Sequence, residues 1–99
     1  MDREKIRLLT EEELTSQLGQ LTGWSREDGK WIVKKYRFPS FPDSMAFVNK
    51  VASIAEELNH HPMIAIDFRL VTLRLTSWSA GGITGLDMES AGRYDELLN

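Results

Sequence analysis

Cysteine is absent from this chain of 99 residues, which excludes disulfide bridges, thiolate nucleophiles, cysteine-ligated zinc and iron–sulfur clusters. Long hydrophobic runs are absent too. Wholly apolar runs such as Met63 to Ile66 are far shorter than the ~20 residues of a membrane-spanning helix, so no membrane partner is expected. The chain also lacks an excess of positive charge, since 12 Lys and Arg stand against 15 Asp and Glu. This balance argues against a nucleic-acid partner.

The remaining composition is that of an ordinary globular protein. Hydrophobic residues make up 41% of the chain and charged residues 27%, which predicts one domain over residues 1–99 with one hydrophobic core. The segment Met1 to Arg7 alternates in charge and has no apolar stretch, so it does not resemble a secretory signal. We therefore expect a cytoplasmic protein.

Three helices are predicted from capping patterns followed by apolar residues at helical spacing. Thr10 with Glu13 forms a capping-box pattern, and the helix that follows is expected to run to about Leu21. Ser40 begins a second helix, which Pro62 is expected to stop. His60 is then expected to be helical, and His61, directly before the proline, to have an extended backbone. The third helix begins after Thr84, with Asp87 three residues on, and continues to Leu98. The core face of the second helix comprises Phe47, Val48, Val51, Ile54, Ala55 and Leu58.

Four strands are predicted between these helices, in two pairs. Residues 24–27 and 31–38 flank Asp28-Gly29, a dipeptide that favours a tight hairpin. In the second pair the apolar residues alternate with polar ones, which predicts one apolar face for burial. The alternating apolar residues are Ile64, Ile66 and Phe68 in one strand and Val71, Leu73 and Leu75 in the other. The fold class is therefore α+β in the order αββαββα, a four-stranded antiparallel sheet with three helices packed on one face.

The candidate catalytic residues are His60 and His61, the only histidines of the chain. Their ordinary pKa of about 6.5 allows proton exchange near neutral pH, and divergent neighbours can reach two atoms of one flat ligand. Glu56 lies four residues before His60, so its carboxylate is expected to hold an imidazole nitrogen of His60. A purely structural role, in which both histidines cap the end of a helix, is about equally compatible with the spacing. A metal site is disfavoured because further ligands are missing.

A second candidate cluster is the small-residue segment Ser77 to Gly82, which contains Trp78. Small residues allow close backbone approach to a ligand, and an indole offers a stacking face and one N–H donor. The alternative is a glycine turn with an anchoring tryptophan. Asp87 has two interpretations as well: helix capping, which its spacing favours, or a carboxylate that faces a pocket.

Together these residues resemble the signature of the pterin-4a-carbinolamine dehydratases. The resemblance rests on fixed positions and spacings over most of the C-terminal half: Glu56, His60-His61-Pro62, aromatic Phe68, Trp78 and Asp87. It implies a lyase that dehydrates 4a-hydroxy-tetrahydropterin to quinonoid dihydropterin in tetrahydrobiopterin recycling, without metal or prosthetic group. His60 and His61 would handle the protons, while Glu56, Trp78 and Asp87 would orient or bind the pterin.

One departure from the family pattern concerns Trp78. Many members carry a third histidine there, and an indole cannot act as a general acid or base. Two histidines must then perform both proton transfers. The resemblance also implies homodimers or homotetramers. It leaves an alternative function open, a non-catalytic dimerisation or assembly cofactor on the same fold, which would not require the histidines.

Overall fold

The computed structural model describes residues 6–99, which form three helices and one four-stranded antiparallel sheet. The predictions made for residues 1–5 lie outside this described part. In chain order the elements are α2 (Glu11–Gly19), β1 (Ser25–Glu27), β2 (Trp31–Arg37), α3 (Phe41–Leu58), β3 (Met63–Asp67), β4 (Leu70–Leu75) and α4 (Gly85–Glu96). The predicted α+β class and the element order are confirmed.

The strands lie in the order β1-β2-β4-β3, so the hairpin of β1 and β2 pairs with β4. Asp28 and Gly29 both adopt positive φ in the first hairpin, at 53° and 72°, as a tight turn requires. In the register of β2 and β4, Ile32 lies opposite Leu75 and Tyr36 opposite Val71. This register puts the apolar side chains of both strands on one face of the sheet.

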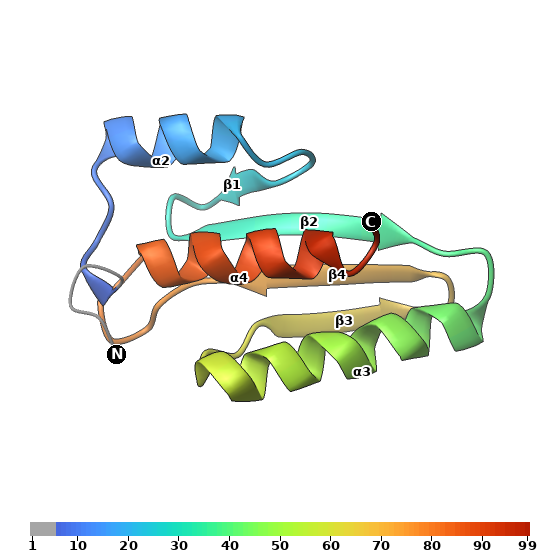
Figure 1. The fold of residues 1–99 in the computed structure, drawn as a ribbon. Helices are drawn as coiled ribbons and strands as arrows, with labels where there is room; N and C mark the ends of the chain where they lie inside the picture. The colour runs from blue at the N-terminus through green and yellow to red at the C-terminus, as the bar shows by residue number, and fades with distance from the viewer. Residues whose placement is uncertain (1–5) are drawn as a thin grey trace.

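Helices pack on that apolar face (Figure 1), with α4 running along β2 and β4 and α3 lying beside the edge strand β3. A single cluster of buried side chains forms the core between the two layers. It draws Leu14 from α2, Phe47, Val51 and Ile54 from α3, Ala91 and Tyr94 from α4, and Ile32, Tyr36, Val71, Leu73 and Leu75 from the sheet. Within residues 6–99, no helix is long and apolar enough to cross a membrane.

The prediction for β3 is correct in register and wrong in burial. Ile64 lies opposite Leu73 and Ile66 opposite Val71, as the alternation requires. Both isoleucines nevertheless remain 37% and 41% exposed, because β3 is an edge strand that the helices do not cover. Phe68 is not part of the strand at all. It lies in the turn before β4 with φ of 54° and is 63% exposed.

The caps place the helices largely where the sequence predicts them. Thr10 and Glu13 form both hydrogen bonds of a capping box at the start of α2. This helix ends at Gly19, two residues earlier than expected, because the amides of Gln20 and Leu21 bond to carbonyls three residues back. Ser40 caps α3 by accepting a hydrogen bond from the amide of Asp43.

Candidate active site

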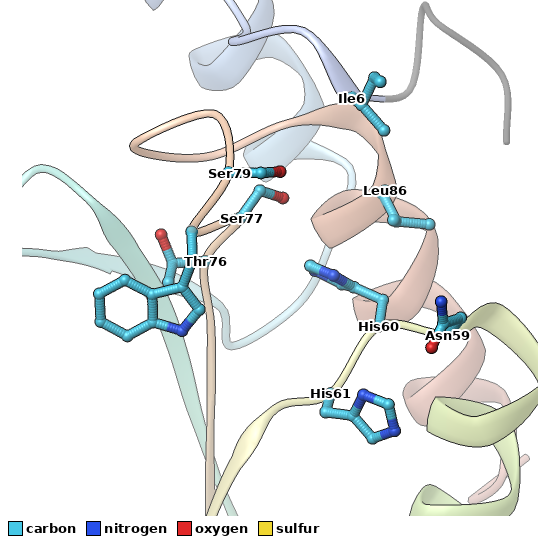
Figure 2. A pocket seen from close by; sticks show the side chains of 9 residues that line it. Ile6, Asn59, His60, His61, Thr76, Ser77, Ser79 and Leu86 are labelled. Carbon is cyan, nitrogen blue, oxygen red and sulfur yellow. The ribbon is translucent and has the colours of Figure 1, made fainter.

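A cavity of about 420 Å³ opens at one end of the sheet, where the segment after α3, the end of β4 and the first turn of α4 meet. Figure 2 shows the side chains that surround it. A volume of this size lies within the range of small-molecule pockets. The lining residues are Ile6, Asn59, His60, His61, Thr76, Ser77, Trp78, Ser79 and Leu86. Both histidines and Trp78 therefore line one cavity, as the resemblance stated above implies.

The end of α3 determines where the two histidines point. Asn59 adopts the left-handed conformation with φ of 50° and ends the helix, three residues before Pro62. The amide of His60 donates to the carbonyl of Ala55 at 3.0 Å, which satisfies one of the last helical carbonyls. The prediction that His60 is helical and that Pro62 stops the helix is thus wrong. A left-handed asparagine ends it and directs the chain away from the helix axis.

The imidazole of His60 is held by Asp87, not by Glu56. Its Nε2 atom lies 2.5 Å from Oδ1 of Asp87, and the His60 side chain is only 13% exposed. The expected pair of Glu56 and His60 does not form, because the four-residue spacing brings side chains together only where both residues are helical. The tertiary contact between the end of α3 and the start of α4 replaces it.

Asp87 is fully buried and uses both of its carboxylate oxygens. Oδ2 accepts hydrogen bonds from the Ser77 hydroxyl at 2.8 Å and from the Thr84 amide at 2.9 Å, while Oδ1 faces His60. The Ser77 and Thr84 hydroxyls lie 2.8 Å from each other. Asp87 therefore caps α4, as its spacing predicts, and it orients His60 from a buried position instead of facing the cavity itself. Asp87 influences the cavity only through its contact with His60, which lines the cavity.

His61 points in a different direction and has a different carboxylate partner. Its Nε2 atom lies 2.5 Å from Oε2 of Glu56, and both side chains are open to solvent, at 55% and 79% exposed. In Figure 2 the two imidazole rings diverge, with that of His61 turned toward the end of α3. Each histidine thus engages a carboxylate through Nε2, which leaves its Nδ1 atom without such a partner. The two pairs differ mainly in burial.

The turn that carries Trp78 has a fixed backbone and an open side chain. Ser77 and Gly82 bond to each other in both directions, at 2.9 and 3.3 Å, and Gly81 takes φ of 79°. The Trp78 side chain is 78% exposed. Its indole lies against that of Trp31 on β2, with ring centroids 5.2 Å apart and planes at 84°.

An ion pair between α3 and α4 supports the geometry of the site. Arg93 of α4 donates to the carboxylate of Glu57, one residue before the last residue of α3. The hydrogen bond, together with the attraction of the opposite charges, lowers the pKa of Glu57 and raises that of Arg93. The pair lies at the surface and contributes little to stability, yet it joins the two elements that hold His60 and Asp87.

Some residues of the site carry no signal in the sequence. Ile6, Asn59 and Leu86 line the cavity, and Trp31 contacts Trp78. Each of these residues is distant in the sequence from at least one residue that it meets in the site, so no local motif indicates the contact. Only Asn59, next to the histidines, could have been inferred from a helix-end pattern. Within the described residues, no three His, Asp or Glu side chains converge in a way that could hold a metal ion.

Comparison with known proteins identifies relatives along almost the whole chain. Residues 7–97 match the family described as Pterin 4 alpha carbinolamine dehydratase. A relative from Roseiflexus castenholzii is 47% identical over 91 residues, which cover 92% of this chain and 97% of the relative. Another, from Koribacter versatilis, is 48% identical over 89 residues and covers 90% and 94% of the two chains. Both carry the name of a pterin-4-alpha-carbinolamine dehydratase, assigned provisionally.

Two solved structures share the fold. A protein from Brucella melitensis, described as a transcriptional coactivator/pterin dehydratase, superposes with a TM-score of 0.88 at 32% identity and covers 92% of this chain and 98% of its own. A pterin dehydratase-like protein, described as a RuBisCO assembly factor in the alpha-carboxysome, has a TM-score of 0.65 at 25% identity and covers 76% and 88%. The match of residues 7–97 and the identity to these relatives show that the chain belongs to the pterin 4 alpha carbinolamine dehydratase family.

Proposed function

We propose that this protein dehydrates 4a-hydroxy-tetrahydropterin to quinonoid dihydropterin and water, and so serves tetrahydrobiopterin recycling. The observation that carries the proposal is the arrangement of both histidines around one cavity, each with a carboxylate 2.5 Å from its Nε2 atom. Family membership supports the reaction class. The substrate would enter the cavity between the histidines and Trp78.

The reaction needs one acid and one base. The C4a–O bond breaks as the hydroxyl oxygen accepts a proton and leaves as water, while N5 loses its proton and forms a double bond to C4a. In the neutral form, the carboxylate contact keeps the imidazole proton on Nε2 and leaves the Nδ1 lone pair free to accept a proton. An imidazolium offers an Nδ1 proton instead. His60 and His61 thus supply the acid and the base between them.

After each turnover, the starting protonation states of the two histidines must be restored. One has given a proton and the other has accepted one, so the pair ends the reaction with its protonation states reversed. His61 is 55% exposed and can exchange its proton with water directly. Water can therefore reset His61 directly, and after the product leaves it reaches His60 through the cavity that both histidines line.

A dehydration assay tests the proposal. The substrate is generated enzymatically, and the appearance of quinonoid dihydropterin is followed by absorbance above the spontaneous rate. We expect the wild-type protein to accelerate dehydration and the double variant His60→Ala/His61→Ala to return it to the spontaneous rate. Asn49→Ala, an exposed position on α3, is the matched control and should retain full activity. A wild-type rate equal to the spontaneous one contradicts the proposal.

A second candidate function is a non-catalytic binding or assembly module. It is favoured by the open sheet edge, where every residue of β3 is exposed, and by the descriptions of the two solved relatives. The same edge, with Met63 55% exposed and Phe68 63% exposed, supports the expected assembly into homodimers or homotetramers. The double histidine variant distinguishes the two functions, because a module keeps its binding activity in that variant and an enzyme does not keep its turnover.

A further inference from the structure

Trp78 lines the cavity although few protein atoms pack against its indole ring. Its side chain is 78% exposed, while the cavity it lines is otherwise built on the ends of α3, β4 and α4. A large exposed side chain moves among several rotamers. A ligand that contacts the side chain in only one rotamer must immobilise it, and the entropy lost in doing so lowers the binding affinity. The orientation of this ring must therefore come from a neighbour.

Trp31 is that neighbour. The two indoles lie 5.2 Å apart between centroids, at an interplanar angle of 84°. This edge-to-face arrangement is one that aromatic pairs prefer, because the positive edge of one ring meets the negative face of the other. Trp31 is partly buried at the start of β2, so its ring is less free to move than the exposed ring of Trp78.

The sheet keeps Trp31 in register with the turn. Ile32 lies opposite Leu75 at the end of the paired register, so Trp31 and Thr76 are the next residues toward this end of the two strands. The buried Thr76 hydroxyl donates to the carbonyl of Lys30 at 2.6 Å and holds this end of the two strands together. Because alternate residues of a strand share a face, Trp31 stands on the open side of the sheet, away from buried Ile32. Trp78 reaches the same side from the turn after β4.

We propose that Trp31 is a positioning residue of the pterin site, which fixes the plane of the Trp78 indole and so presents this ring to the bound pterin in one orientation. This inference rests on the proposed function. Trp31 is not among the residues that line the cavity, so it acts through Trp78 and takes no part in proton transfer. Its removal should weaken pterin binding and leave the chemical step intact.

The test is a double-mutant cycle of Trp31→Leu and Trp78→Ala. Trp31→Leu should raise KM by about 2- to 10-fold, the range that one aromatic pair supplies, with kcat within about twofold of wild type. In the Trp78→Ala background the same substitution should raise KM no further. Trp31→Phe retains a ring on the strand, so its KM should fall between those of wild type and Trp31→Leu.

A spectroscopic measurement checks the contact itself. Two indoles in contact give exciton-coupled bands in far-ultraviolet circular dichroism, and Trp31→Leu and Trp78→Ala should each remove the same bands. Phe41→Leu is the matched control, since this exposed aromatic residue begins α3 at the end opposite the histidines. It should leave both KM and the bands unchanged.

The possible failures can be distinguished. If Trp31→Leu leaves KM unchanged, or raises it equally with and without Trp78, the inference is wrong while the proposed function stands. If the wild-type protein shows no turnover but binds 7,8-dihydrobiopterin, the proposed reaction is wrong. The double-mutant cycle is then measured with the dissociation constant of that pterin in place of KM, and it still tests the role of Trp31. If the wild-type protein neither turns over substrate nor binds this pterin, both are overturned. Should Trp31→Leu not fold, Trp31→Phe and Trp78→Ala complete the comparison.

Discussion

The imidazole of His60 lies 2.5 Å from the carboxylate of Asp87, which is fully buried and already accepts hydrogen bonds from Ser77 and Thr84. A buried carboxylate in such a network cannot turn away without losing these bonds. The His60 ring is therefore fixed in orientation. The corresponding partner of His61, Glu56, is 79% exposed and has no such constraint.

The first prediction concerns Asp87→Asn. An amide can still accept from Ser77 or Thr84, but its NH₂ group would face Nε2 of His60 as a donor and shift the imidazole proton to Nδ1. The Nδ1 atom could then no longer accept a proton in the neutral form. We expect kcat to fall by about 10²- to 10⁴-fold, measured by steady-state kinetics.

Capping must be separated from positioning in that experiment, because Asp87 also caps α4. Ser40→Ala removes a cap from α3, outside the site, and should cost about 1 kcal/mol of stability while activity stays at the wild-type level. If Ser40→Ala reduces kcat as much as Asp87→Asn does, general destabilisation explains the loss and the positioning role of Asp87 is wrong.

The second prediction separates the two histidines by stability. His60→Ala and His61→Ala should each slow dehydration by about 10²- to 10⁴-fold. His60→Ala leaves a buried carboxylate oxygen of Asp87 without its partner, so unfolding in urea should show a loss of about 1–3 kcal/mol. His61→Ala should change stability by no more than about 0.5 kcal/mol, because its partner is solvated. His60→Gln can donate to Asp87 and should recover stability without activity. Equal stability losses in both alanine variants would contradict this account.

The fold is predictable from the sequence wherever local patterns agree with the final packing. The capping box at Thr10, the cap at Ser40 and the turn at Asp28-Gly29 each depend on residues within four positions of one another. The burial of β3 was not predictable in this way. Its alternating Ile64 and Ile66 specify a face and a partner strand, but only the order of strands decides whether helices cover that face.

The candidate site, too, is predictable where local patterns determine it and not where contacts between separate elements determine it. The sequence brings His60, His61 and Trp78 to one cavity through family spacing, and the structure places them there. It assigns Glu56 to the wrong histidine, because the pairing depends on whether Asn59 continues the helix or ends it. The contacts of His60 with Asp87 and of Trp78 with Trp31 join separate elements, and no local pattern encodes them.

The third prediction concerns acid stability. Hydrogen bonds from Arg7 and from the Thr10 amide lower the pKa of Glu13 from 4.5 to about 2. A carboxylate whose pKa is lower in the folded state stabilises the fold above its unfolded pKa, and this contribution is lost as the pH falls from 4.5 to 2. Glu13→Gln retains a capping partner but cannot titrate, so its free energy of unfolding should decline less steeply over this range than that of wild type.

Urea unfolding at several pH values measures that slope, with Glu12→Gln as the control. Glu12 is exposed in the same helical turn and is not part of the capping box, so its substitution should leave the slope as in wild type. An identical slope for Glu13→Gln and wild type would show that the bond network around Glu13 does not contribute to the acid stability of the fold.

The last prediction concerns Trp78, which lines the cavity together with the two histidines. An indole has an aromatic face and an N–H donor but no proton that titrates near neutral pH, so Trp78 should hold the pterin by ring contact. Trp78→Phe keeps a face and should retain most of the activity, whereas Trp78→Ala should raise KM more than it lowers kcat. Trp78→His should give an active enzyme with an altered pH profile. Steady-state kinetics across pH decide among these outcomes: a fall of kcat in Trp78→Phe as deep as in His60→Ala would mean that the indole N–H takes part in the chemical step itself, and that two histidines alone do not account for the proton transfers.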